Sequence, residues 1–275
     1  MLQDTPLTAG QRVAARVEYH GGYFHGWQSQ PKLTCPTVQE AVQEALSKVA
    51  STRVHTICAG RTDTGVHGFG QVIHFEDPVG RSPKAWVMGT NRYLPGSVRL
   101  HWAEPVSGDF HARFSAVSRR YRYIVLNTPV RSSLLDGLVT WCRHALDVDA
   151  MHQAASTLVG ERDFSAFRAA GCQAFKPMRC VTHCAVVRMG DYVVIDIVAN
   201  AFLLHMVRNI AGSLLAVGSG ARPLSWLAEV LDKRDRRLAA ETAPAEGLYL
   251  VRVSYPAQFD LPDTPEGPGL LRGWM

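Results

Sequence analysis

The chain has 275 residues, of which 47% are hydrophobic, so it can bury a core in one large domain or two closely joined ones. Residues 1–6 lack a basic start followed by an apolar run, which argues against a secretory signal. The longest apolar stretch, residues 201–218, is interrupted by His205, Arg208 and Asn209, which argues against a membrane span. We therefore expect a soluble, globular protein.

The charge of the chain suggests an acidic partner such as nucleic acid. The formal net charge is +5 and the pI is near 9.0, and residues 113–275 carry +4 of that charge. Most of the basic residues are arginines, which suit phosphate contacts and stacking on bases. A genomic bias toward alanine, glycine and arginine would give the same pattern, so composition alone favours RNA binding only modestly.

The six cysteines show no Cys-x-x-Cys spacing, so we expect a reducing cytoplasm and no disulfides. The segment from Cys180 to Cys184, which includes His183, could form half of a metal site. The chain offers no second ligand pair for it, and buried thiols on a strand are the better interpretation.

The first elements in chain order are a strand and a helix. Alternating residues over 13–18 predict a half-buried strand, and the glycine-rich segment 21–28 that follows predicts a loop with three aromatics. Those aromatics could stack on bases or could anchor the loop to the core. Thr37 and Glu40 form a capping box, and the apolar spacing after them predicts an amphipathic helix over 38–50.

Asp63 stands among four glycines in the next stretch of the chain, residues 58–75. The β-branched residues over 53–58 and the run over 71–75 predict two strands, which places Asp63 on a tight loop between them. Glycines on both sides would let the backbone approach a ligand closely. An ordinary glycine-rich turn is the alternative.

A single carboxylate on such a loop has three possible uses. The triplet Asp63-Thr64-Gly65 is similar to the aspartic protease triplet, but those enzymes need two carboxylates sharing a proton and this chain has one triplet. A metal site would need more ligands than His67. A nucleophile paired with an arginine fits better, because the ion pair keeps the carboxylate ionised.

The following elements complete one α+β half and begin a second. A helix over 82–94 and a strand over 98–106 close the first half, and residues 111–116 link it to a strand over 119–126. We place the domain boundary near residue 112.

The strand over 119–126 begins by alternating arginine with tyrosine. Tyr121 and Tyr123 share one face of this strand, and Arg120 and Arg122 share the other. A basic face opposite an aromatic one is compatible with RNA recognition. The strand could equally bury its tyrosines and expose its arginines to solvent.

The second half continues with several predicted elements. They are a helix over 149–158, a loop over 164–179, a hairpin of 181–188 with 192–199, a helix reaching 218, a helix over 224–232, a strand over 248–253 and an irregular tail over 256–275.

The segment that leads into the helix ending at residue 218 carries a polar face. His205, Arg208 and Asn209 are spaced at i, i+3 and i+4 on a helix that is otherwise apolar. A buried arginine needs a carboxylate partner, and we expect Asp63 to be that partner of Arg208. The alternative is that the polar face meets solvent.

The residues from Gly60 to His67, Gly-Arg-Thr-Asp-Thr-Gly-Val-His, resemble the active-site signature of the tRNA pseudouridine synthase A family. Members often have alanine where this chain has Gly68, which is a small-for-small difference. Further blocks of resemblance follow in the same order along the chain: Asn91-x-x-Leu94-Pro95, His111 to Ala116, Arg120 to Tyr123, Phe164-x-x-Phe167 with Gly171-Cys172-Gln173, Phe202 to Asn209, and Ala243 to Leu248.

The resemblance implies the pseudouridine synthase fold, an α+β architecture of two similar halves of mainly antiparallel sheet with packed helices and a central active-site cleft. With the boundary placed near residue 112, residues 1–112 are the half that carries the catalytic loop, residues 113–255 are the half that carries Tyr121 and the Arg208 helix, and residues 256–275 are the tail. The resemblance also implies a homodimer that binds tRNA, isomerises uridines 38, 39 and 40 of the anticodon stem-loop, and uses no cofactor or metal.

The resemblance also assigns roles to individual residues. Asp63 is expected as the nucleophile, Arg208 as its ion-pair partner, and Tyr121 as the residue that stacks on the target uracil and could assist proton loss. Arg61 is expected to aid base extrusion, and His205 to contact the substrate. A carboxylate suits this reaction, because cleavage of the N-glycosidic bond develops oxocarbenium-like charge on the ribose.

Two other classes of function stay open from the sequence. A non-catalytic tRNA-binding or remodelling protein would use the same basic cleft without turnover. A dimeric aspartic hydrolase would cleave peptides at acidic pH and would not respond to tRNA.

Overall fold

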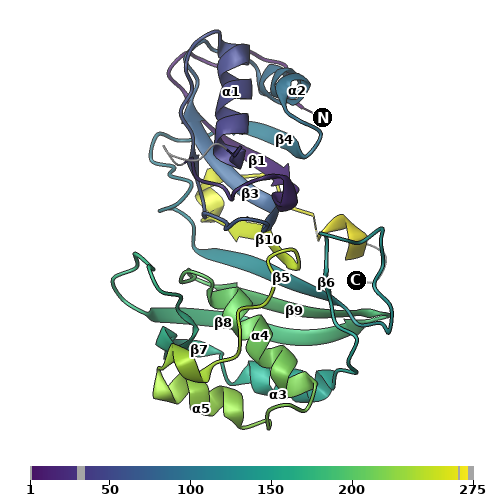
Figure 1. Cartoon of the computed structure of the whole chain (residues 1–275). Coiled ribbons are helices and arrows are strands. Elements are labelled where there is room, and N and C mark those ends of the chain that lie inside the picture. Colours follow the sequence, from purple (N-terminus) through teal and green to yellow (C-terminus); the bar gives the residue numbers. More distant parts are fainter. Residues whose placement is uncertain (1, 30–34, 266, 272–275) are drawn as a thin grey trace. The chain divides into compact units, whose positions relative to one another are not determined.

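The computed structural model describes residues 2–29, 35–265 and 267–271 (Figure 1). The chain divides into two compact units. Of the described residues, the first contains those up to Val117 and those from Leu250 to Leu271, and the second contains Ser118–Tyr249. The last strand therefore begins in the second unit and continues in the first, where the sequence analysis had placed it wholly in the second half.

The first unit is built on a sheet with the strand order β4-β1-β3-β10, in which β1 pairs antiparallel with both β3 and β4. Its strands are β1 (Arg12–Tyr19), β2 (Ile57–Cys58), β3 (His67–Glu76), β4 (Val98–Pro105) and the part of β10 (Leu248–Ser254) that belongs to this unit. The short strand β2 pairs with β3. The strand expected over 53–58 is thus reduced to its last two residues, and the strand expected over 71–75 begins earlier, at His67.

Helices α1 (Val38–Ala50) and α2 (Pro83–Tyr93) lie side by side over the sheet of the first unit (Figure 1). The capping box predicted at Thr37 and Glu40 is present, with the Glu40 backbone N–H donating to Thr37 Oγ1 and the Glu40 carboxylate accepting from the Thr37 backbone. Apolar residues of α1, α2, β1, β3 and β4 form one buried cluster. Both helices are confirmed at the predicted positions.

The second unit has a sheet with the strand order β5-β9-β8-β7. Its strands are β5 (Ser118–Leu126), β6 (Thr140–Trp141), β7 (Gly160–Asp163), β8 (Met178–Met189) and β9 (Tyr192–Ala199), and its helices are α3 (Val148–Ser156), α4 (Met206–Gly218) and α5 (Trp226–Lys233). All pairs along this path are antiparallel, whereas β6 adds to β5 in parallel. The α+β class with mainly antiparallel sheets is confirmed.

Single-turn 3-10 helices occur in both units. They are η1 (Gly21–Tyr23), η2 (Ser165–Phe167), η3 (Arg236–Leu238), η4 (Ala257–Phe259) and η5 (Gly269–Leu271). Among the described residues, no helix is both long enough and apolar enough to cross a membrane.

Helix α4 begins later than its apolar run suggests. His205 adopts a left-handed conformation (φ 58°), so the regular helix starts at Met206 and residues 200–205 form an irregular lead-in. The side chain of Asn200 organises this lead-in, because its Oδ1 accepts from the backbone N–H groups of Ala201 at 2.8 Å and Cys180 at 3.1 Å.

The segment after β10 packs on the first unit. The rings of Phe259 and Phe110 meet edge to face with centroids 5.1 Å apart. Leu271 is fully buried, and a Cβ at Gly267 would lie 2.2 Å from the ring of Phe69. The described part of the expected tail is therefore fixed on the sheet by aromatic contacts, although it contains no strand.

Candidate functional site

Asp63 lies on a tight loop, residues 59–66, between β2 and β3, and we call this segment the Asp63 loop. The Asp63 side chain is half-buried, whereas Arg61 and Thr64 are exposed. The carbonyl of Asp63 accepts from the Val66 N–H at 3.1 Å, and Gly65 takes φ +81° to complete the turn. The prediction that Asp63 sits on a loop between two strands is confirmed.

The start of the Asp63 loop is fixed by the fully buried side chain of Gln71 on β3. Gln71 Nε2 donates to the carbonyl of Gly60 at 2.6 Å, and Gln71 Oε1 accepts from the Gly60 N–H at 3.3 Å. The Ala59 N–H also donates to the carbonyl of Val72 at 2.8 Å. One side-chain amide therefore replaces the strand pairing that ends after Cys58.

The β1–α1 segment holds the other side of the Asp63 loop. The Trp27 N–H donates to the Thr62 carbonyl at 3.0 Å, and the hydroxyls of Tyr19 and Thr62 lie 2.7 Å apart. The Gly21 N–H donates to His67 Nδ1 at 3.1 Å. Thr62, immediately before Asp63, is thus bound through both its backbone and its side chain, which restricts the position of the carboxylate.

Two of the three aromatics of the β1–α1 segment have the anchoring role that the sequence left open. Phe24 and Trp27 are buried and anchor the segment to the core, whereas Tyr23 is 66% exposed. Tyr23 packs edge to face on His20 with centroids 4.8 Å apart. Anchoring therefore explains two of the three rings.

Positive charge gathers at the base of the Asp63 loop. Burial raises the pKa of the Cys58 thiol to about 11, and the nearby charges of Arg61 and Arg113 oppose that rise without cancelling it. Cys58 therefore stays a neutral thiol at physiological pH and is not a nucleophile. The same two guanidinium groups give this surface an attraction for anions.

In the second unit, Tyr121 lies on β5 with 8% of its surface exposed. Its ring meets that of Phe202 edge to face, with centroids 5.1 Å apart and planes at 83°. Tyr123, on the same face of the strand, is fully buried, and its hydroxyl lies 2.6 Å from Thr140 Oγ1 and donates to the Pro244 carbonyl at 3.0 Å.

Arg208 is half-buried on the first turn of α4 and forms two hydrogen bonds with Ala243. Its Nε donates to the carbonyl of Ala243 at 2.8 Å, and the Ala243 N–H donates to the Arg208 carbonyl at 3.1 Å. This reciprocal pair fixes the guanidinium plane relative to the helix. His205, half-buried at the N-cap, lies one turn before it.

Asn209 has a structural role on the same helix face. Its side chain is fully buried, and its Nδ2 donates to the Phe167 carbonyl at 2.7 Å. Asn209 Oδ1 accepts from Arg236 at 3.0 Å and from Thr242 at 2.6 Å. The network fixes the start of α4, so this part of the expected polar face does not meet solvent.

The basic face of β5 is neutralised by a residue that the sequence analysis did not identify. The carboxylate of Asp196 on β9 accepts hydrogen bonds from Arg120 Nε at 2.8 Å, from Arg120 Nη2 at 2.6 Å and from Arg122 Nε at 3.0 Å. Burial alone would raise the pKa of Asp196, but the two arginines outweigh it and lower the pKa. These arginines are partnered within the sheet, which neither of the two earlier interpretations anticipated.

The predicted site residues are divided between the two units. Asp63 and Arg61 belong to the first unit, and Tyr121, His205 and Arg208 belong to the second. The described residues contain no group of three or more histidine, cysteine, aspartate or glutamate side chains that could hold a metal ion.

The profile of a family described as tRNA pseudouridine synthase matches residues 15–115 and 154–256. The chain belongs to the tRNA pseudouridine synthase family. Its relatives include proteins named tRNA pseudouridine synthase A from Citrobacter koseri, 53% identical over 260 residues (94% of this chain, 96% of that protein), and from Actinobacillus succinogenes, 52% identical over 260 residues (94% and 98%). The corresponding Enterobacter protein is 51% identical over 270 residues, which cover 98% of this chain and 99% of that protein.

A chain from the crystal structure of a Cbf5-Nop10-Gar1 complex is similar over 85% of this chain and 50% of its own length, with 14% identity and a TM-score of 0.35. The assignment of the chain to its family rests on the family profile and on the sequence relatives. As a tRNA pseudouridine synthase, the chain is an isomerase that converts uridine to pseudouridine in tRNA.

Several residues that contact the candidate site residues of this tRNA pseudouridine synthase carry no sequence signal of their own. Gln71 reads as one polar residue in a strand, and its role depends on its register opposite Gly60. Phe202 and Ala243 act through contacts with Tyr121 and Arg208 that are distant in sequence. Only the resemblance of the blocks around Phe202 and Ala243 could have pointed to them.

Proposed function

We propose that this tRNA pseudouridine synthase acts on uridines 38, 39 and 40 of the anticodon stem-loop, with Asp63 as its nucleophile. The N-glycosidic bond of the target uridine breaks, the uracil rotates, and its C5 bonds to the ribose carbon. C5 then loses its proton and the former glycosidic nitrogen gains one. The Asp63 carboxylate attacks or stabilises the electron-poor centre that forms during cleavage.

The observation that carries this proposal is the rigid support of the Asp63 loop. Gln71 binds Gly60 through both its amide atoms, and Thr62 is bound by Trp27 and Tyr19. A nucleophile gains rate when its position is fixed before the substrate arrives. Asp63 itself stays partly accessible, as a group that must reach a bound nucleotide requires.

The other residues have roles that their surroundings support. Arg61 is exposed on the Asp63 loop and would hold the strand from which the uridine is extruded. Tyr121 has its ring fixed by Phe202 and would stack on the uracil, and its phenol could assist proton loss from C5. Arg208, with Nε held by Ala243, would pair with Asp63 through its remaining nitrogens.

His205 would contact the substrate from the N-terminus of α4, beside Arg208. We further propose that the protein works in the cytoplasm as a homodimer that binds one tRNA across both subunits. A dimer would sediment at about twice the mass of the 30.3 kDa chain at micromolar concentration, and a monomer that is fully active would exclude this part of the proposal.

The test is pseudouridine mapping on an unmodified tRNA transcript, incubated with the purified protein in chelator. A matched transcript carries cytidine at positions 38–40 and keeps its other uridines. We expect pseudouridine at 38–40 in the first transcript and none in the second. Pseudouridine at other positions in both transcripts would refute the proposed target while leaving the family's activity intact.

A further inference from the structure

The segment 111–115, which we call the Phe114 turn, presents a large aromatic ring to solvent. Phe114 is 76% exposed, and the guanidinium of Arg113 lies 5.5 Å from its ring centroid. The imidazole of His111 packs against the same ring, with centroids 4.4 Å apart and planes tilted by 30°. Core packing therefore does not explain the position of Phe114.

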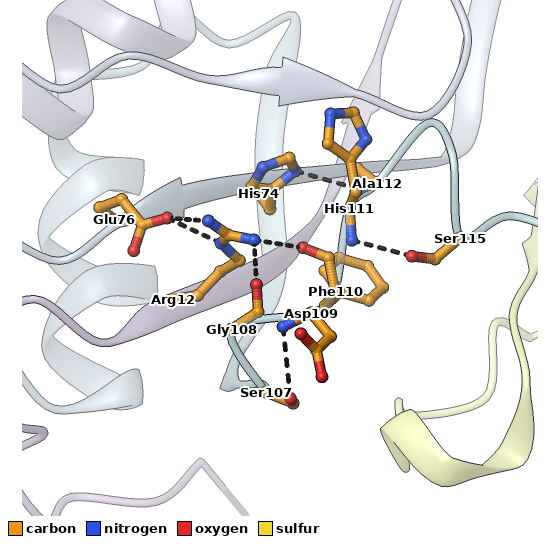
Figure 2. Close-up of polar contacts among 10 residues, drawn as sticks. All are labelled: Arg12, His74, Glu76, Ser107, Gly108, Asp109, Phe110, His111, Ala112 and Ser115. Atoms are coloured by element: carbon orange, nitrogen blue, oxygen red, sulfur yellow. Dashed lines mark hydrogen bonds and ion pairs between the residues drawn. The ribbon is translucent and has the colours of Figure 1, made fainter.

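Hydrogen bonds to both the side chain and the backbone of His111 hold the Phe114 turn. His111 Nδ1 accepts from the backbone N–H groups of Arg113 and Phe114, each at 3.2 Å. The His111 N–H donates to Ser115 Oγ at 2.9 Å (Figure 2). Burial, with the charges of Arg12 and Arg113, lowers the pKa of His111, so Nδ1 is an unprotonated acceptor at neutral pH.

Ala112 and Phe110 anchor the same turn to the sheet. The Ala112 N–H donates to Nδ1 of the buried His74 at 3.0 Å, and the Tyr255 hydroxyl donates to the Ala112 carbonyl at 2.7 Å (Figure 2 shows the His74 contact). Arg12 Nη1 donates to the Phe110 carbonyl at 2.8 Å. A ring on so fixed a turn loses little conformational entropy when it binds a ligand.

The Phe114 turn lies next to the strand that leads into the Asp63 loop. His74, which anchors the turn, lies on β3 and pairs there with Ile57, the first residue of β2. The charges of Arg61 and Arg113 both act on Cys58, the last residue of β2. Both arginines are exposed, so they supply positive charge to one stretch of surface between the Asp63 loop and the Phe114 turn.

We propose that Phe114 stacks on a tRNA base that neighbours the target uridine, and that Arg113 contacts a backbone phosphate of the same strand. The inference rests on the proposed chemistry at Asp63. A base next to an extruded uridine loses one of its stacking partners, and an exposed aromatic ring replaces it. A guanidinium beside the ring suits a nucleotide, which offers a π face and a phosphate at once.

The first experiment measures the Kd for an unmodified tRNA transcript and the single-turnover rate at saturating enzyme. For Phe114→Ala we expect the Kd to rise about 10- to 100-fold, for Phe114→Leu a similar rise, and for Phe114→Trp a value within about threefold of the native one. Arg113→Gln should lower the slope of log K against log salt by about 0.7 to 0.9, whereas Phe114→Ala should leave that slope unchanged.

The matched control is Tyr93→Ala. Tyr93 is also an exposed ring of the first unit with a cation, Lys48 Nζ, 5.6 Å from its centroid. Its removal should leave tRNA affinity unchanged. If Phe114→Leu binds as tightly as the native protein, aromatic stacking is refuted, and if Phe114→Ala changes the oligomeric state but not the Kd, the ring belongs to a protein interface instead.

A second readout tests placement directly. With p-azidophenylalanine in place of Phe114, irradiation should crosslink the protein to nucleotides next to positions 38–40, and the same probe at Tyr93 should not. Crosslinks confined to distant parts of the tRNA would overturn the inference. Failure of the Asp63 proposal is distinguishable, because it would alter the modified positions or the activity of Asp63 variants while these crosslinks persisted.

Discussion

Gln71 and Gly60 form a two-point amide contact, in which the side-chain Nε2 donates to the Gly60 carbonyl at 2.6 Å and Oε1 accepts from the Gly60 N–H at 3.3 Å. Gln71 is fully buried on β3, and Gly60 lies three residues before Asp63. The contact therefore transmits the rigidity of the sheet to the loop that carries the proposed nucleophile.

Replacing Gln71 by leucine should impair both folding and catalysis. The substitution leaves two polar backbone groups of Gly60 without their partner, so the free energy of unfolding should fall by about 2 kcal/mol. The Asp63 loop should also lose its fixed position, which should lower kcat about 10- to 100-fold with little change in KM. Urea unfolding and steady-state kinetics measure the two effects; a stability loss with unchanged kcat would refute the positioning role.

Replacing Gly21 by alanine should displace the Asp63 loop. A Cβ at Gly21 would lie 2.0 Å from the carbonyl oxygen of Val66, so one of the two segments must move. Gly96→Ala is the control, because a Cβ there meets nothing within 4 Å. We expect at least a tenfold loss of kcat for Gly21→Ala and native kinetics for Gly96→Ala. Equal activity of the two variants would contradict the close packing.

Asp196→Asn should destabilise the second unit. Asp196 is bound by Arg120 and Arg122, and neutralising the carboxylate removes a buried negative charge that both guanidinium groups contact. We expect a loss of about 3 kcal/mol in the free energy of unfolding. Because its pKa is lowered in the folded state, the contribution of Asp196 is present above its unfolded pKa and is lost as pH falls through the folded value. Urea unfolding at pH 7 and pH 3 should show a smaller deficit at pH 3.

His74, which anchors the Phe114 turn, should make the free energy of unfolding fall when the pH is lowered mildly. Burial, with the charges of His111 and Arg12 nearby, lowers the pKa of His74 from 6.5 to about 4. The unfolded chain binds this proton more readily, so stability should decrease as pH falls from about 6.5 toward 4, by on the order of 2 kcal/mol. His74→Gln keeps an acceptor for the Ala112 N–H and should flatten this dependence; an unchanged pH profile would assign it to other groups.

The regular elements of the fold were predictable because local signals agree with tertiary structure. The capping box at Thr37 and Glu40 and the apolar spacing after it define α1, and Gly190 marks the β8–β9 hairpin. The strands β6 and β7 were missed because they span two and four residues and owe their existence to neighbouring strands. The return of β10 to the first unit likewise depends on long-range pairing that no local pattern encodes.

The candidate site was predictable only in part, for a related reason. The position of Asp63 on a loop between strands follows from its glycines and the flanking β-branched residues. The partners of charged side chains do not follow, because they depend on register: Asp196 reaches Arg120 and Arg122 only because β5 and β9 align these residues. Asn209 looked like part of a functional face, and its partner Arg236 lies on a separate 3-10 helix.

The most direct test of the account is the single-turnover rate of pseudouridine formation for Asp63→Asn, with enzyme in excess over an unmodified tRNA transcript. Thr64→Ser, at the exposed neighbouring position, is the matched control. We predict that Asp63→Asn loses about 10⁴-fold or more in rate while its Kd for tRNA stays within about threefold of the native value, and that Thr64→Ser is nearly native. An Asp63→Asn rate within tenfold of the native rate would contradict the assignment of Asp63 as the nucleophile.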